Sequence, residues 1–197
     1  SLADLDGDGV AETVAGRQVL TADGTLRWTG TGGRGMNSNF FGPISTVVDL
    51  DLDGRPEIVG GNTAYRGQGP QQGQILWQTL NAPGGQVPDG YTAAGNFDQD
   101  PNPELVLVGQ GVVWMLEHDG AVKFGPLAIP GGAGFGSSPA IGNVDDDPEL
   151  EFVVSGRTRL VVFEGDGSVA WTALSPLPPQ PNREVAAAVL FDFDGDG

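Results

Sequence analysis

The sequence contains no cysteine, and only one histidine and one lysine stand among its 197 residues. The absence of cysteine excludes disulfides and thiol chemistry, although it does not choose a cellular compartment. The single histidine, His118, lies beside a predicted turn, and we interpret it as a solvent-exposed imidazole. No spacing pairs a serine with this histidine, so the usual acid, base and nucleophile are missing. The residues therefore favour a protein that is not an enzyme.

Basic residues and long apolar runs are also scarce. Lys and Arg together number 9 against 26 Asp and Glu, which gives a net charge of -17. Nucleic acids and anionic membrane surfaces are poor partners for such a chain, because like charges repel. No apolar run approaches the ~20 residues of a membrane span, so no membrane insertion is expected in this segment.

The abundant feature is an acidic loop that recurs along the chain. The motif Asp-x-Asp-Gly-Asp-Gly-x-x-Glu begins at Asp4, and further copies begin at residues 49, 96, 143 and 192, with spacings of 45, 47, 47 and 49 residues. Of the 26 acidic residues, 17 stand at the loop positions that offer a side-chain carboxylate as ligand. A period of this size indicates an array of supersecondary units.

Each loop has the layout of a cation site made of oxygen ligands. The side chains of positions 1, 3 and 5 turn toward one centre, position 7 offers its carbonyl, and a carboxylate at position 9 closes the shell, as in Ca²⁺ sites. A single copy could be an Asx-rich turn, but carboxylates repeated in phase would repel one another without a counter-ion. The predicted Ca²⁺ ligands are Asp4, Asp6, Asp8, Val10, Glu12, Asp49, Asp51, Asp53, Arg55, Glu57, Asn96, Asp98, Asp100, Asn102, Glu104, Asn143, Asp145, Asp147, Glu149, Glu151, Asp192, Asp194 and Asp196.

Two loops depart from the pattern at position 6. Gly9 and Gly54 permit a sharp turn with positive φ, but the third and fourth loops carry Pro101 and Pro148 there, and both begin with Asn. Proline holds φ near -65°, so these loops cannot copy the glycine geometry. We therefore expect the first two loops, with four carboxylates each, to bind Ca²⁺ more tightly.

Between the loops the chain has the signals of β-strands. An apolar run follows each loop Glu, as is typical of strands covered on both faces. A second strand and a two-residue turn come next, with Asp-Gly at residues 23, 119 and 166. An aromatic residue follows the turn in every unit, and its fixed register indicates packing between units, with a sugar-stacking platform as the alternative. These aromatics are Trp28, Trp77, Phe124 and Trp171, and Trp114 is predicted to be core as well.

These features predict an all-β fold, a β-propeller with four blade repeats in residues 1–197. The chain holds four periods that are cut at the same phase at both ends, so we expect one domain or a fragment of a larger propeller of about six to eight blades. The competing arrangement is a closed four-bladed ring, in which residues 185–191 supply the inner strand of the first blade.

The repeats resemble a known family. Phe41-Gly42-Pro43, leading into the segment from Val47 to Gly61, resembles an FG-GAP repeat of the integrin α-chain and bacterial VCBS type, and Phe135-Gly136 before the fourth loop repeats it. The resemblance covers essentially the whole chain. It implies a Ca²⁺-binding β-propeller that is secreted or on a cell surface and serves in adhesion or ligand recognition.

The function expected is therefore a secreted or cell-surface adhesion or ligand-binding module, with an unknown extracellular protein or glycan as partner. The alternative is a carbohydrate-active propeller, either a lectin or a polysaccharide lyase, to which such repeats are also similar. Partner contacts are expected on the connections at residues 29–39, 81–89 and 126–134. The acidic residues Asp89, Glu117 and Glu184 are interpreted as solvated surface.

Overall fold

The computed structural model describes residues 1–33, 43–131, 136–145, 147–174, 189 and 190. Every described element is a β-strand, so the all-β class predicted from the sequence is confirmed. Within these ranges no helix is long and apolar enough to cross a membrane. Some predictions fall outside the described residues. These concern the fifth loop, which begins at Asp192, the Phe41-Gly42 pair, Glu184, and residues 185–188 of the predicted last strand.

The strands form four antiparallel sheets of four strands each, and in every sheet the spatial order follows the sequence. We call these sheets, with their loops, units 1 to 4. Unit 1 contains β1 (Leu2–Ala3), β2 (Glu12–Ala15), β3 (Gln18–Leu20) and β4 (Leu26–Thr29); unit 2 contains β5 (Thr46–Val48), β6 (Glu57–Gly60), β7 (Thr63–Arg66) and β8 (Ile75–Gln78). Unit 3 contains β11 (Tyr91–Gly95), β12 (Glu104–Gly109), β13 (Val112–Leu116) and β14 (Val122–Ala128); unit 4 contains β15 (Ala140–Gly142), β16 (Glu151–Ser155), β17 (Arg159–Phe163) and β18 (Val169–Leu174).

One connection has structure that the sequence did not indicate. Residues 81–86 form a separate hairpin of β9 (Asn81–Ala82) and β10 (Gly85–Gln86). Its turn depends on Gly84 and Gly85, whose φ angles of 103° and 133° strain any side chain. A Cβ added at Gly84 would lie 2.8 Å from Pro126 Cδ, so the hairpin is packed closely against β14.

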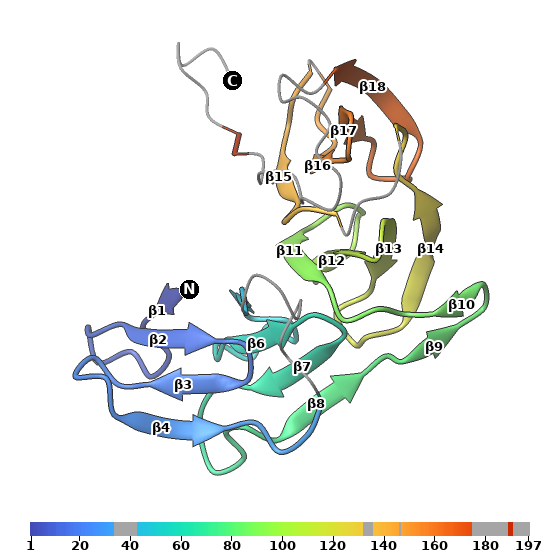
Figure 1. Ribbon diagram of the computed structural model, residues 1–197. Coiled ribbons are helices and arrows are strands. Elements are labelled where there is room, and N and C mark those ends of the chain that lie inside the picture. The colour runs from blue at the N-terminus through green and yellow to red at the C-terminus, as the bar shows by residue number, and fades with distance from the viewer. Residues whose placement is uncertain (34–42, 132–135, 146, 175–188, 191–197) are drawn as a thin grey trace.

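The first strands of the units lie side by side, and the sheets fan outward from them (Figure 1). β11 contacts both β5 and β15. The Thr46 hydroxyl donates to the carbonyl of Thr92 over 2.8 Å, and the Ser1 hydroxyl hydrogen-bonds the carbonyl of Ser45. The strands here are rich in small residues, as predicted, which lets backbones of neighbouring sheets approach.

The second strands are the most deeply buried elements. All residues of β6, β12 and β16 are buried, which confirms the expectation that apolar runs at consecutive positions belong to strands covered on both faces. In β12, Leu105 and Leu107 face the core shared with unit 2, while Val106 and Val108 face the core shared with unit 4. Side chains of successive strand residues point to opposite faces, so one strand contributes to two cores.

Three of the aromatic residues that follow the two-residue turns, which we call the register aromatics, join their unit to the next. Each packs against the turn glycine of the following unit, so closely that a Cβ added to that glycine would lie within 3 Å of the ring. The contacts are Trp28 with Gly73 (2.9 Å), Trp77 with Gly120 (2.6 Å) and Phe124 with Gly167 (2.9 Å). These three aromatics therefore pack between units, as predicted, and Trp114 is buried at 1% exposure. Trp171 departs from this pattern, because 46% of it is exposed.

The inner edge of unit 1 is formed by the first residues of the chain. Leu2 pairs with Thr13 and Ala3 with Glu12, and the Val14 N–H donates to the carbonyl of Ser1 over 2.9 Å. This is the place that the closed-ring alternative assigned to residues 185–191. That alternative is wrong in this respect, because the hydrogen-bonding edge of β2 is already paired.

Candidate metal centres

The acidic loops connect the first and second strands of each unit and gather at one end of the sheets. Asn102, at position 7 of the third loop, donates from Nδ2 to the carbonyl of Leu50 in the second loop over 2.9 Å, which ties two neighbouring loops together. In every unit the structure brings at least three carboxylates together, with ligand oxygens within 4.8 Å of one another. These groups are Asp4, Asp6 and Asp8; Asp49, Asp51 and Asp53; Asp98, Asp100, Glu104 and Glu117; and Asp145, Glu151 and Glu164.

The Glu at position 9 has the same geometry in all four units. One of its carboxylate oxygens accepts a hydrogen bond from the backbone N–H of loop position 2, and the residue is buried. The bonds are Leu5 N to Glu12 (2.9 Å), Leu50 N to Glu57 (3.0 Å), Phe97 N to Glu104 (2.7 Å) and Val144 N to Glu151 (2.7 Å). Burial raises the pKa of the carboxyls of Glu104 and Glu151, and it raises that of Glu57 to about 7. The charged forms of Glu57, Glu104 and Glu151 are therefore unfavourable unless a cation lies near them.

The glycine loops hold their first aspartate by backbone N–H groups. Asp4 accepts hydrogen bonds from the N–H of Gly7 at 2.7 Å and of Gly9 at 2.8 Å, and Asp49 accepts one from Gly54 at 2.8 Å. The bond from Gly9 is the main reason that the pKa of Asp4 is lowered. Gly9 and Gly54 have φ of 87° and 83°, as the sequence predicted.

The proline loops use a different bond, which explains why Asn and Pro occur together. Pro101 and Pro148 have no N–H to offer to position 1. Instead, Asn96 Nδ2 donates to the carbonyl of Asp100 over 2.6 Å, and Asn143 donates likewise to Asp147. An aspartate cannot donate such a bond, so asparagine is the fitting residue at position 1 when position 6 is proline.

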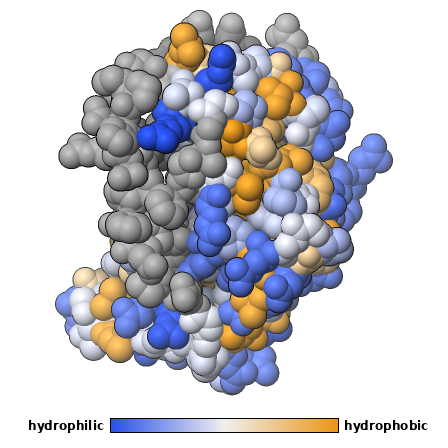
Figure 2. Space-filling model, turned by 45° about the vertical axis from the view of Figure 1, so that its right-hand side comes forward, coloured by the Kyte–Doolittle hydropathy of each residue, from blue (hydrophilic) through white to orange (hydrophobic). Residues whose placement is uncertain are grey.

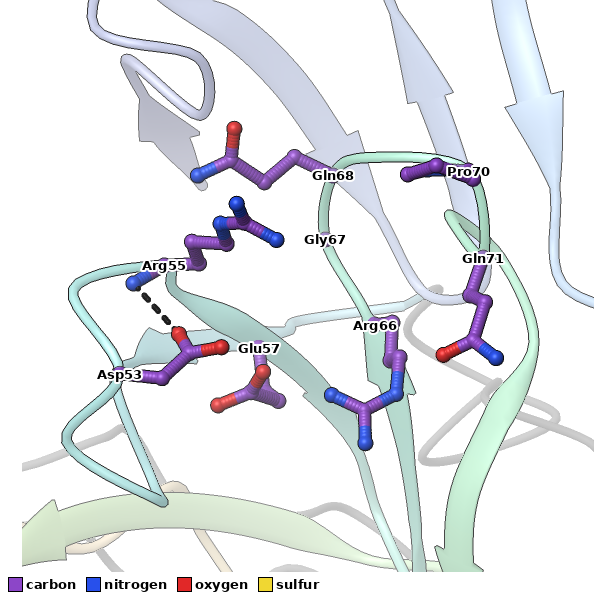
Figure 3. Close-up of a pocket in the computed structure, with 8 residues that line it drawn as sticks. All are labelled: Asp53, Arg55, Glu57, Arg66, Gly67, Gln68, Pro70 and Gln71. Atoms are coloured by element: carbon purple, nitrogen blue, oxygen red, sulfur yellow. Dashed lines mark hydrogen bonds between the residues drawn. The ribbon is translucent and has the colours of Figure 1, made fainter.

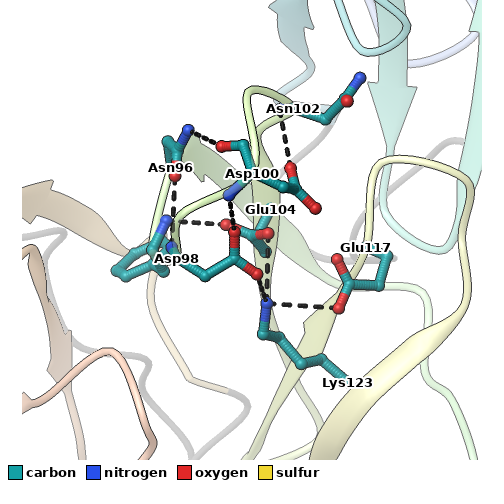
Figure 4. A network of polar contacts seen from close by, with 8 residues as sticks. Asn96, Asp98, Asp100, Asn102, Glu104, Glu117 and Lys123 are labelled. Atoms are coloured by element: carbon teal, nitrogen blue, oxygen red, sulfur yellow. Dashed lines mark hydrogen bonds and ion pairs between the residues drawn. The ribbon is translucent and has the colours of Figure 1, made fainter.

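In two units a cationic side chain from the fourth strand pairs with the acidic loop. In unit 1, Arg27 lies 2.8 Å from Asp6 and 3.0 Å from Glu12. In unit 3, Lys123 contacts Asp98 at 2.5 Å, Glu104 at 3.2 Å and Glu117 at 3.3 Å (Figure 4).

The protonated form of Lys123 is stabilised by these contacts. Burial alone lowers the pKa of Lys123, but its hydrogen bonds to Asp98, Glu104 and Glu117 raise that pKa above its usual value. The ammonium therefore remains charged among the carboxylates of the third loop.

Arg27 and Lys123 both occupy a β-bulge, which turns their side chains toward the acidic loops. In each sheet the pairing of the third and fourth strands shifts by one residue, and the extra residue stands directly before the register aromatic. A bulge redirects a side chain relative to its neighbours. The bulge residues are Arg27, Leu76, Lys123 and Ala170. The fixed spacing to the aromatic could have identified this position from the sequence.

Unit 2 has a pocket beside its acidic loop. The pocket has a volume of about 330 Å³ and lies between the second loop and residues 67–71 (Figure 3). Glu57 and Asp53 contribute carboxylates to it, and Arg55 and Arg66 contribute guanidinium groups. Arg66 is 3.8 Å from Asp51, a looser ion pair than those of Arg27 and Lys123.

The structure corrects the interpretation of several residues. Glu117 is not solvated surface, because it pairs with Lys123, and Asp89 is partly buried. His118 is partly buried rather than exposed, and its backbone carbonyl accepts a hydrogen bond from Trp77 Nε1 at 2.8 Å. Glu164 lies outside the loop motif, yet its carboxylate belongs to the group in unit 4.

Comparisons with known proteins show the fold but not the family. No protein-family model and no curated protein matches the chain. The crystal structure of the V. cholerae biofilm matrix protein Bap1 is similar, with a TM-score of 0.66 and 21% identity over 89% of this chain and 28% of that chain. A rhamnogalacturonan lyase, YesW, has a TM-score of 0.49 and 20% identity over 89% of this chain and 27% of its own. The likeness to Bap1 indicates a shared fold alone, and this chain spans about 28% of that protein's length.

Proposed function

We propose that this chain is a Ca²⁺-binding part of a β-propeller of the FG-GAP/VCBS type, acting outside the cell as an adhesion or ligand-binding module rather than as an enzyme. The observation that carries the proposal is the repeated buried Glu. In each unit it binds the loop backbone through one oxygen, and in units 3 and 4 its carboxylate lies within the acidic group of the loop. Four sheets of four strands, fanned from adjacent first strands, support the propeller (Figure 1).

The ligand chemistry favours calcium over other metals. The grouped side chains are carboxylates, and neither cysteine nor histidine belongs to any group among the described residues. Hard oxygen ligands in a flexible loop suit Ca²⁺, whereas Zn²⁺ prefers nitrogen and sulfur. Bound ions would neutralise the loops and join their ends, so we propose a structural role for the metal.

The binding role rests on surfaces away from the loops. Apolar and hydrophilic residues are interspersed on the face that Figure 2 shows. A biofilm matrix protein shares the fold, which supports an extracellular place and an adhesive role for this chain. We propose a protein or glycan of the cell surroundings as the partner.

Calcium removal tests the proposal. An ion that binds only the folded state contributes about 2.7 kcal/mol per site at a hundredfold excess over Kd. For a chain of this size each kcal/mol raises Tm by about 2–4 °C, so we expect about 5–10 °C per occupied site. The measurement is thermal unfolding in chelator and in millimolar Ca²⁺, with Mg²⁺ at equal ionic strength as the control. A melting curve that Ca²⁺ leaves unchanged after verified metal removal would refute the proposal.

The carbohydrate alternative has one observation in its favour. Trp171 is 46% exposed on β18, beside Val169 at 44%, and an open indole face can stack on a sugar ring. Titration with a panel of polysaccharides, followed by tryptophan fluorescence, would test it. Saturable quenching that Trp171→Ala abolishes supports a lectin. Shortened products in the same samples would instead indicate a lyase and would overturn the non-enzymatic role.

A further inference from the structure

The acidic group of unit 4, like that of unit 3, includes a carboxylate from outside its loop. Asp145 and Glu151 belong to the loop, but Glu164 directly follows β17. It lies across from Glu151, because the neighbouring residues Phe152 and Phe163 are paired. Their carboxylate oxygens lie within 4.8 Å of one another. Three carboxylates from two segments thus converge on one point.

Unlike the acidic groups of the other units, the group of unit 4 has no basic side chain as a counter-charge among the described residues. Units 1 and 3 place Arg27 and Lys123 at the bulge position, and unit 2 places Arg66 across from its loop Glu. In unit 4 the corresponding residues are Ala170 and Glu164. Within the described part of the chain, no lysine or arginine forms an ion pair with this group.

A second observation concerns the carboxylate of Glu151. Glu151 is 0% exposed, and Oε2 accepts the bond from Val144 N. Its other oxygen, Oε1, is buried and has no hydrogen-bond partner. A buried carboxylate oxygen without a partner is strongly unfavourable. A hard divalent cation bound to this oxygen would be its partner, and the same ion would neutralise the neighbouring carboxylates of Asp145 and Glu164.

We propose that unit 4 binds a divalent cation, Ca²⁺ by its ligand chemistry, through Asp145, Glu151 and the non-loop carboxylate Glu164, whereas Arg27 and Lys123 take the cation's place in units 1 and 3. The proposal rests on the proposed calcium function and names the loop that depends most on the ion. For units 1 and 4 it reverses the affinity order expected from position 6, because Arg27 neutralises part of the glycine loop of unit 1 and no such cation of the described residues pairs with the proline loop of unit 4.

The first test removes the non-loop ligand. Glu164→Gln keeps the shape of the side chain and removes its charge, and Glu117→Gln makes the same change at the corresponding position of unit 3. Calorimetric titration of the 197-residue chain with Ca²⁺ should show the tightest site weakened about tenfold or more by Glu164→Gln, because affinity follows ligand charge. Glu117→Gln should leave that site unchanged. Equal effects of the two variants would overturn the proposal.

The second test supplies the missing cation. Ala170→Lys gives unit 4 the lysine that unit 3 has at its bulge, so we expect one fewer bound Ca²⁺ and a higher Tm in chelator. Circular dichroism confirms folding, and Leu76→Ala, a neutral change at the same position of unit 2, is the control. If the parent chain binds no Ca²⁺, the proposed function fails. If it binds Ca²⁺ but neither Glu164→Gln nor Ala170→Lys alters the tightest site, this inference alone fails.

Discussion

The contact between each aromatic and the next unit's turn predicts how glycine substitutions rank. Gly24, Gly120 and Gly167 occupy the same turn position, with φ of 84°, 84° and 86°. A Cβ at Gly24 meets nothing within 4 Å, whereas one at Gly120 lies 2.6 Å from Trp77 Cδ2. Gly24→Ala and Gly120→Ala therefore share the backbone strain and differ in the packing between units.

The size of the difference follows from these two terms. An alanine with positive φ costs about 1–2 kcal/mol, and both variants bear this cost. Overpacking a methyl group against a fixed ring adds about 1–3 kcal/mol. We expect Gly24→Ala to lower the free energy of unfolding by about 1–2 kcal/mol and Gly120→Ala by about 2–5 kcal/mol, from the sum of these terms.

Urea unfolding of both variants in the same Ca²⁺ concentration measures the difference. The slope of free energy against urea should stay constant, so that the midpoint reports stability alone. Gly167→Ala should behave like Gly120→Ala, because its Cβ would meet Phe124 Cε2 at 2.9 Å. Equal losses in Gly24→Ala and Gly120→Ala would show that the aromatic does not depend on the neighbouring turn.

Two further predictions concern the loop carboxylates. Burial raises the pKa of Glu57 from 4.5 to about 7, so in chelator the stability it contributes is present below pH 4.5 and is lost as the pH rises through 7. Glu57→Gln should flatten the pH dependence of unfolding in that window, and an unchanged slope would contradict the assignment. Lys123→Met leaves the buried Glu104 without its cation and should cost about 3 kcal/mol, the lower end for a broken buried pair, because Lys123 is partly exposed. Adding Glu104→Gln should restore a part of this loss. A double-mutant cycle measures this coupling, and a coupling energy of zero would refute it.

The sequence was sufficient for features that depend on local chemistry. The strands after each loop Glu, the positive φ of Gly9 and the grouping of most loop carboxylates follow from turn geometry and from the repeat. Glu12, Glu57 and Asp147 are predicted ligands that lie outside these groups. It was insufficient for features that depend on cross-strand register. Lys123 lies 25 residues from Asp98 and reaches it because a bulge redirects the lysine. Glu164 was missed for the same reason, since only pairing across β16 and β17 brings it to Glu151.

The aromatic contacts between units have a direction. Trp28 packs against the turn of unit 2, Trp77 against that of unit 3 and Phe124 against that of unit 4, so each contact is made with the later unit. Such nearest-neighbour contacts make stability a sum over units and their junctions. A substitution that disrupts one turn therefore also lowers the stability of the preceding unit, whose aromatic packs against that turn. Each unit thus depends on the unit that follows it in the sequence.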